Sequence, residues 1–218
     1  MAQDEQSQIA AQIRDKAKVT ASFAGRGTLL TEPILVINQK AKFVDLVSEY
    51  KVFDGNGAQV ATVQQEGGKK WLRLVVNKAL LPAHVVIKDL AGNPLLRVDK
   101  KFSAWRPKVF LQDGSGNEIG QFVWAKMLGK AKIEFHVGGQ CIGGIKAQNW
   151  RAWNFSLEDE SGMEVGTISK TWAGLGKEMF TNADHYVMAL SRPLPAQLAQ
   201  FAVGASLCID TVLKQSNA

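Results

Sequence analysis

The chain has 218 residues, of which 46% are hydrophobic and 21% are charged, and both fractions are typical of a globular protein with a sizeable core. Lysine and arginine total 26 against 20 acidic residues, so the net charge of +6 favours an anionic partner, either nucleic acid or anionic lipid head groups. Two cysteines without a CxxC motif argue against a disulfide scaffold and favour a reducing compartment.

Residues 1–30 are expected to form a leader, either a short helix or a disordered segment. They mix acidic, amide and basic side chains, and they lack the apolar stretch of about 7–15 residues that marks a secretory signal. We therefore expect a cytoplasmic protein whose one folded domain spans residues 31–218.

One hairpin pattern occurs four times, at 52–63, 87–98, 111–122 and 157–168. In each copy an Asp opens a type I turn, and a Gly three residues later takes the left-handed conformation that closes a bulged hairpin. None has the alternating carboxylates of a calcium loop, so we interpret them as structural turns. The flanking runs are strand-like and predict ten or more antiparallel strands. The Asp and Gly pairs are Asp54/Gly57, Asp89/Gly92, Asp113/Gly116 and Asp159/Gly162.

Residues 64–108 contain ten basic and three acidic residues, so this segment holds all of the excess positive charge. Trp105 stands among four cations in 100–108, an arrangement that suits a lipid interface, where the indole lies at head-group level. The alternative is a solvated face with Trp105 packed inward. The lipid- or anion-binding residues that we predict are Lys69, Lys70, Arg73, Lys100, Lys101, Trp105, Arg106 and Lys108.

Other chemistry receives little support. His84, His136 and His185 lack zinc-ligand spacing, and the sequence contains neither a phosphate-binding loop nor a G-x-S-x-G elbow. Cys141 is interpreted as part of a Gly-rich turn rather than as a nucleophile. We expect a non-enzymatic protein without a cofactor.

Residues 198–213 are the most continuously apolar stretch. A helix of this length measures about 24 Å, which is short of the roughly 30 Å needed to cross a membrane. Gln200, Ser206 and Asp210 weaken the spanning interpretation further. We predict a buried helix over about 196–214 that begins after Pro193 and Pro195.

Residues 167–210 resemble the C-terminal segment of the phospholipid scramblase family, and 32–60 are similar to the segment that opens the same domain. The resemblance covers residues 31–213 and indicates a microbial member. It implies a mostly β fold shared with Tubby C-terminal domains and LURP-one-related proteins, a closed antiparallel barrel of about twelve strands around a central apolar C-terminal helix. The matching residues include the family-motif positions Lys170, Trp172, Asp184 and Asp210.

Family members proposed to respond to calcium carry acidic side chains just before the helix. This chain has Asn182, Pro193 and Pro195 there, and only Asp184 remains as a weak candidate ligand. We therefore expect no calcium site and no other metal. The family's palmitoylated cysteine cluster and proline-rich extension are missing from this sequence.

The resemblance implies binding to phospholipid or to an anionic membrane surface, without an integral span and at the inner face of the plasma membrane. Energy-independent transbilayer movement of phospholipid is the further activity that the family suggests. The alternative is a soluble binding or regulatory module whose basic face contacts nucleic acid or a protein partner.

Overall fold

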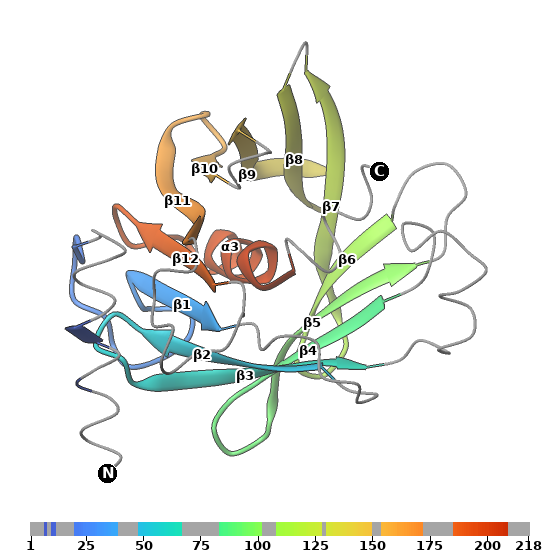
Figure 1. The fold of residues 1–218 in the computed structure, drawn as a ribbon. Coiled ribbons are helices and arrows are strands. Elements are labelled where there is room, and N and C mark those ends of the chain that lie inside the picture. Colours follow the sequence, from blue (N-terminus) through green and yellow to red (C-terminus); the bar gives the residue numbers. More distant parts are fainter. Residues whose placement is uncertain are drawn as a thin grey trace.

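The computed structural model describes residues 7, 10, 11, 20–38, 48–66, 83–101, 108–127, 130–149, 154–171 and 185–208. Within these residues, twelve antiparallel strands form a closed barrel, in which each strand pairs with the next and the first closes onto the last (Figure 1). One apolar helix, α3 (Ala196–Cys208), lies inside the ring of strands. This confirms the barrel with a central helix that we predicted. The strands are β1 (Ile34–Asn38), β2 (Ser48–Asp54), β3 (Gln59–Glu66), β4 (Ala83–Lys88), β5 (Pro94–Lys101), β6 (Lys108–Asp113), β7 (Glu118–Met127), β8 (Lys130–Val137), β9 (Gln140–Asn149), β10 (Asn154–Asp159), β11 (Glu164–Thr171) and β12 (His185–Leu190).

The alternating strand directions give the barrel two ends. The short turns that join β2 to β3, β4 to β5, β6 to β7, β8 to β9 and β10 to β11 lie at one end, which we call the hairpin end. The remaining strand-to-strand connections leave from the opposite end, which we call the loop end. Because β12 finishes at the hairpin end, α3 begins there, where Leu198 lies against Gly143, and runs through the barrel toward the loop end.

The four predicted Asp–Gly turns are present at the hairpin end. Their glycines have φ angles of 78°, 88°, 92° and 82°, in the left-handed region that favours glycine. In the third turn Asp113 Oδ1 accepts hydrogen bonds from the Ser115 and Asn117 amides, each at 2.9 Å. The carboxylate is therefore engaged by its own turn, as the structural interpretation requires.

The helix fills the centre of the barrel. All residues from Phe201 to Leu207 are buried, so two consecutive turns face protein on every side. The ring of Phe201 stacks on Phe135 with centroids 5.1 Å apart and meets Phe122 edge-on at 5.0 Å. The predicted burial of the apolar stretch is confirmed for residues 198–207, in which Gln200 is half-buried and the others are buried, and 209–214 lie outside the described residues.

Small and polar residues adapt α3 to this position. A Cβ atom built on Gly204 lies 3.1 Å from Leu111 Cδ1, so the glycine allows the strands to approach the helix closely. Ser206 is fully buried, and its Oγ donates to the Val203 carbonyl at 2.8 Å, so its hydroxyl is satisfied within the helix. Among the described residues, no helix has both the length and the apolar character needed to cross a membrane.

Candidate functional site

The outer surface of β4, β5 and β6 is positively charged. Residues that alternate with the buried core positions of these strands point outward, and in the described residues they include four cations and one carboxylate. We call this surface the basic face. The four cations are Lys88, Arg97, Lys101 and Lys108, and the carboxylate is Asp99.

Two exposed lysines mark the part of the basic face nearest the loop end. Lys101 and Lys108 are direct partners in the β5–β6 register, which places their like charges side by side on one surface. Lys101 Nζ lies over the half-buried Phe110 ring, 4.4 Å from its centroid. This corner therefore offers two cations and an aromatic ring together.

The other cations of the basic face donate to neutral groups, Lys88 to Gln64 and Arg97 Nε to the Gly114 carbonyl at 3.4 Å, and its carboxylate faces a histidine. Lys88 Nζ donates to Gln64 Oε1 at 2.6 Å and has no acidic partner among the described residues. The Asp99 carboxylate lies 2.9 Å from His84 Nδ1. The local field of this face is thus positive, as required for binding an anion.

The placement of Lys100 differs from our expectation of an exposed binding residue. Its side chain is 1% exposed, because Leu96, Val98 and Lys100 share the inner face of β5. Its Nζ atom has no hydrogen-bond partner among the described residues, and burial lowers the pKa of Lys100. Lys100 therefore does not belong to the outer basic face.

The family-motif residue Lys170 also lies on an inner strand face. It pairs in register with the fully buried Tyr186 and follows the core residue Ile168 at a spacing of two. Its Nζ atom is 5.9 Å from the Tyr186 ring centroid. Lys170 thus faces the barrel interior near the loop end, away from Lys101 and Lys108.

Several predicted positions lie outside the described residues. The chain segments that contain them join β3 to β4 and β5 to β6, or follow β11 and α3. Because Lys101 ends β5 and Lys108 begins β6, the segment between them begins and ends beside the exposed lysine pair. The positions concerned are Lys69, Lys70, Arg73, Trp105, Arg106, Trp172, Asp184 and Asp210.

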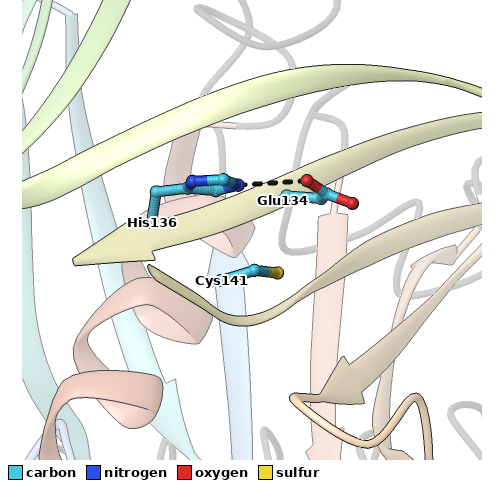
Figure 2. A group of neighbouring side chains, drawn as sticks. All are labelled: Glu134, His136 and Cys141. Carbon is cyan, nitrogen blue, oxygen red and sulfur yellow. Dashed lines mark hydrogen bonds and ion pairs between the residues drawn. The ribbon is translucent and has the colours of Figure 1, made fainter. Parts of the chain in front are cut away.

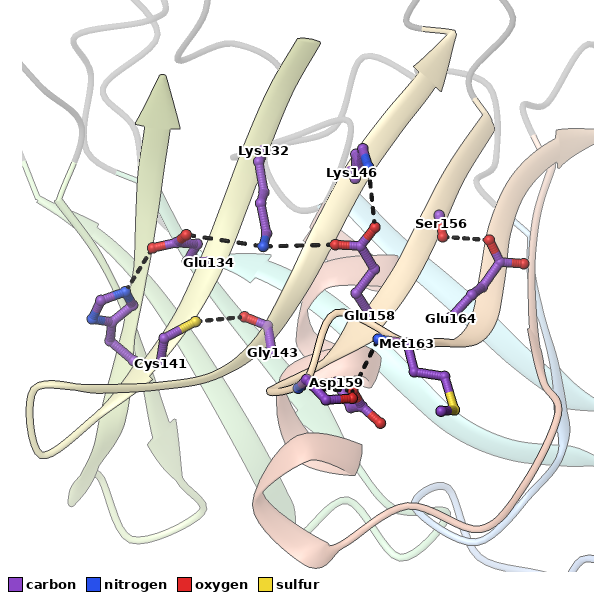
Figure 3. Close-up of polar contacts among 12 residues, drawn as sticks. Lys132, Glu134, Cys141, Gly143, Lys146, Ser156, Glu158, Asp159, Met163 and Glu164 are labelled. Carbon is purple, nitrogen blue, oxygen red and sulfur yellow. Dashed lines mark hydrogen bonds and ion pairs between the residues drawn. The ribbon is translucent and has the colours of Figure 1, made fainter. Parts of the chain in front are cut away.

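The charges on β8, β9 and β10 are arranged differently, as alternating ion pairs (Figure 3). Lys132 Nζ lies 4.0 Å from Glu134 Oε1 and 3.6 Å from Glu158 Oε2. Lys146 Nζ lies 3.5 Å from the other oxygen of Glu158. These two lysines are compensated by acidic partners, whereas Lys101 and Lys108 have none among the residues that the structure describes.

Sequence spacing did not reveal one group of side chains on the same outer surface. Glu134 and His136 of β8 lie beside Cys141 of β9, although the linear sequence has no zinc-ligand motif (Figure 2). The feature of the sequence that could have revealed this group is the Gly138–Gly139 pair, because a two-residue turn at these glycines places position 136 opposite position 141.

Comparison with known proteins identifies related sequences. The family described as Scramblase matches residues 17–213. The curated protein "Altered inheritance rate of mitochondria protein 25" of Saccharomyces cerevisiae is 22% identical over 200 residues, covering 74% of this chain and 59% of that protein. The chain thus spans less than two thirds of that relative's length. An X-ray structure of an Arabidopsis thaliana protein aligns with a TM-score of 0.48 and 17% identity, covering 86% of this chain and 94% of that one.

Proposed function

The chain belongs to the scramblase family, and from this premise we propose that it binds anionic phospholipid surfaces as a peripheral protein, through the basic face of the barrel. The role is one of binding rather than chemical catalysis. The observation that carries the proposal is the exposed pair Lys101 and Lys108, which project side by side without an acidic partner among the described residues.

The charge and the side-chain chemistry of the basic face both favour a membrane surface as the partner. Lysine side chains reach phosphates with a mobile ammonium group and bury their apolar stems at the interface. Each basic residue near an anionic membrane contributes about 1 kcal/mol of binding free energy. Lys101, Lys108 and Arg97 lie on neighbouring strands of one surface, so several contacts can form at once.

Co-sedimentation with vesicles tests the proposal. We expect the protein to bind phosphatidylcholine vesicles that contain phosphatidylserine, to bind pure phosphatidylcholine vesicles far less, and to dissociate as salt is raised. Loss of two lysines at about 1 kcal/mol each weakens binding by about 30-fold. We therefore expect Lys101→Ala/Lys108→Ala to bind anionic vesicles about 30-fold more weakly.

The ion-paired lysines provide a matched control. Lys132→Ala/Lys146→Ala removes the same charge from β8 and β9, where acidic partners already compensate it. We expect this variant to bind within about twofold of the wild type. Equal losses in both double variants would contradict a specific basic face, and tight nucleic-acid binding without vesicle binding would favour the alternative module.

Transbilayer movement of phospholipid is a further activity, beyond surface binding, that membership of the family suggests. Reconstitution in vesicles with fluorescent lipid and dithionite quenching measures it directly. Our proposal predicts surface binding without accelerated quenching, since α3 is occupied as the core of the barrel. Accelerated quenching by the wild-type protein would contradict this prediction. We expect the protein to contact the inner face of the plasma membrane.

A further inference from the structure

Strand geometry brings three metal-ligating side chains together on the outer face of the β8–β9 hairpin (Figure 2). Glu134 and His136 are two residues apart on β8, so their side chains point to the same face. Cys141 of β9 is the register partner of His136 and therefore shares that face. A register shift between Phe135 and His136 marks a bulge, which re-aims the local side chains.

The turn that connects the two strands fixes this register. Gly138 and Gly139 have φ angles of 57° and 84°, so both central positions of the two-residue turn adopt the left-handed conformation. A type I′ turn requires this conformation at both positions and matches the twist of the flanking strands. The Gly–Gly pair thus determines that position 136 faces position 141.

The ligand atoms lie close enough for a single ion. His136 Nε2 is 3.0 Å from Glu134 Oε2, and the three candidate ligand atoms, including Cys141 Sγ, all lie within 4.8 Å of one another. Metal–ligand bonds of about 2.0–2.3 Å in a tetrahedral site place ligand atoms about 3.3–3.8 Å apart. Small side-chain rotations therefore suffice to close the site around an ion.

We propose that Glu134, His136 and Cys141 form a zinc-type transition-metal site with three protein ligands and one open position. An imidazole nitrogen, a thiolate and a carboxylate oxygen form a donor set that suits Zn²⁺. Calcium and magnesium require oxygen ligands and do not fit this set. The site differs from the family's calcium chemistry in residues, location and metal.

Neighbouring groups support this geometry. Lys132 Nζ approaches Glu134 Oε1 at 4.0 Å, while the other oxygen, Oε2, faces His136. The carboxylate therefore presents one oxygen to the ion. Cys141 is exposed, and among the described residues its Sγ donates one weak hydrogen bond, to the Gly143 carbonyl at 3.4 Å (Figure 3). The thiol can exchange this interaction for a bond to a metal ion. The side chains of Glu134 and His136 are 27% and 21% exposed, which leaves solvent access for the ion and its fourth ligand.

Cobalt(II) titration of the full chain, reduced and stripped of metal with a chelator, tests the site. We expect a thiolate-to-cobalt charge-transfer band and the visible bands of a tetrahedral ion, both removed by added Zn²⁺. Cys141→Ser should abolish the charge-transfer band, and His136→Asn should weaken cobalt binding at least about tenfold. Circular dichroism of each variant verifies that the barrel is folded.

His84→Asn is the matched control. His84 also lies beside a carboxylate, with Nδ1 2.9 Å from Asp99 Oδ1, but it has no cysteine in its group. We expect its cobalt affinity to equal that of the wild type. Absence of the charge-transfer band in the wild type, or its persistence in Cys141→Ser, would overturn the proposed site. An equal loss of affinity in His84→Asn would also overturn it.

Discussion

The position of Phe201 gives a quantitative test of the barrel with a central helix. Its side chain is fully buried, and its ring contacts Phe122 and Phe135, which are register partners on the neighbouring strands β7 and β8. Truncation of a buried Phe to Ala destabilises proteins by about 3–5 kcal/mol, including about 0.5–1.5 kcal/mol for each aromatic contact. We expect Phe201→Ala to lower the free energy of unfolding by about 4 kcal/mol, a large part of the 5–15 kcal/mol typical of a domain.

Urea denaturation followed by tryptophan fluorescence and circular dichroism measures this loss. Leu90→Ala is the control, because Leu90 is 65% exposed in the β4–β5 turn and its truncation should change stability by less than about 0.5 kcal/mol. If Phe201→Ala were as mild as Leu90→Ala, the helix would not be packed inside the barrel.

Three further variants test individual features by denaturation or thermal melting. Burial lowers the pKa of Lys100 in the folded protein below its ordinary value of 10.5. At pH values between the lowered pKa and 10.5 the unfolded chain therefore binds more protons than the folded one, and wild-type stability should rise with pH in this range. Lys100→Met should remove this rise and stabilise the fold at pH 7 by about 1–3 kcal/mol. A variant less stable than the wild type would contradict the burial of Lys100 Nζ without a hydrogen-bond partner among the described residues. Hydrogen bonds from Asn117 lower the pKa of Asp113, so the Asp113 carboxylate stabilises the turn above pH 3.8, and this stabilisation is lost as the pH falls below 3.8. Asp113→Asn should therefore lose less stability than the wild type on acidification. An acid unfolding profile equal to that of the wild type would contradict this role of the carboxylate in the turn. A Cβ atom on Gly120 collides with the His136 carbonyl oxygen, so Gly120→Ala should destabilise the fold by about 1–3 kcal/mol. An unchanged melting temperature would contradict this close approach.

Local chemistry made the turns and the helix predictable from sequence. The Asp and Gly of each repeat act within five residues, so their hydrogen bonds depend little on distant parts of the chain. The burial of residues 198–207 followed from length and polarity, because a short, interrupted apolar helix is better covered by protein than by lipid. The closed barrel itself was inferred from the family resemblance together with the strand pattern.

Cross-strand relations limited the prediction of the site. Lys100 and Lys101 are adjacent in a basic run, yet only Lys101 is outside, because Leu96 and Val98 set the inward phase of β5. Extending that two-residue period would have placed Lys100 in the interior. The approach of His136 to Cys141 depends on register across a hairpin, which a search for linear metal motifs does not consider.

Hydrogen–deuterium exchange with and without phosphatidylserine-containing vesicles most directly tests the account of a barrel that binds membranes by its basic face. We expect vesicles to slow exchange in β5 and β6, around Lys101 and Lys108, while α3 (Ala196–Cys208) stays protected to the same extent. Faster exchange in α3 on membrane binding, or slowed exchange confined to β8–β10, would contradict the account.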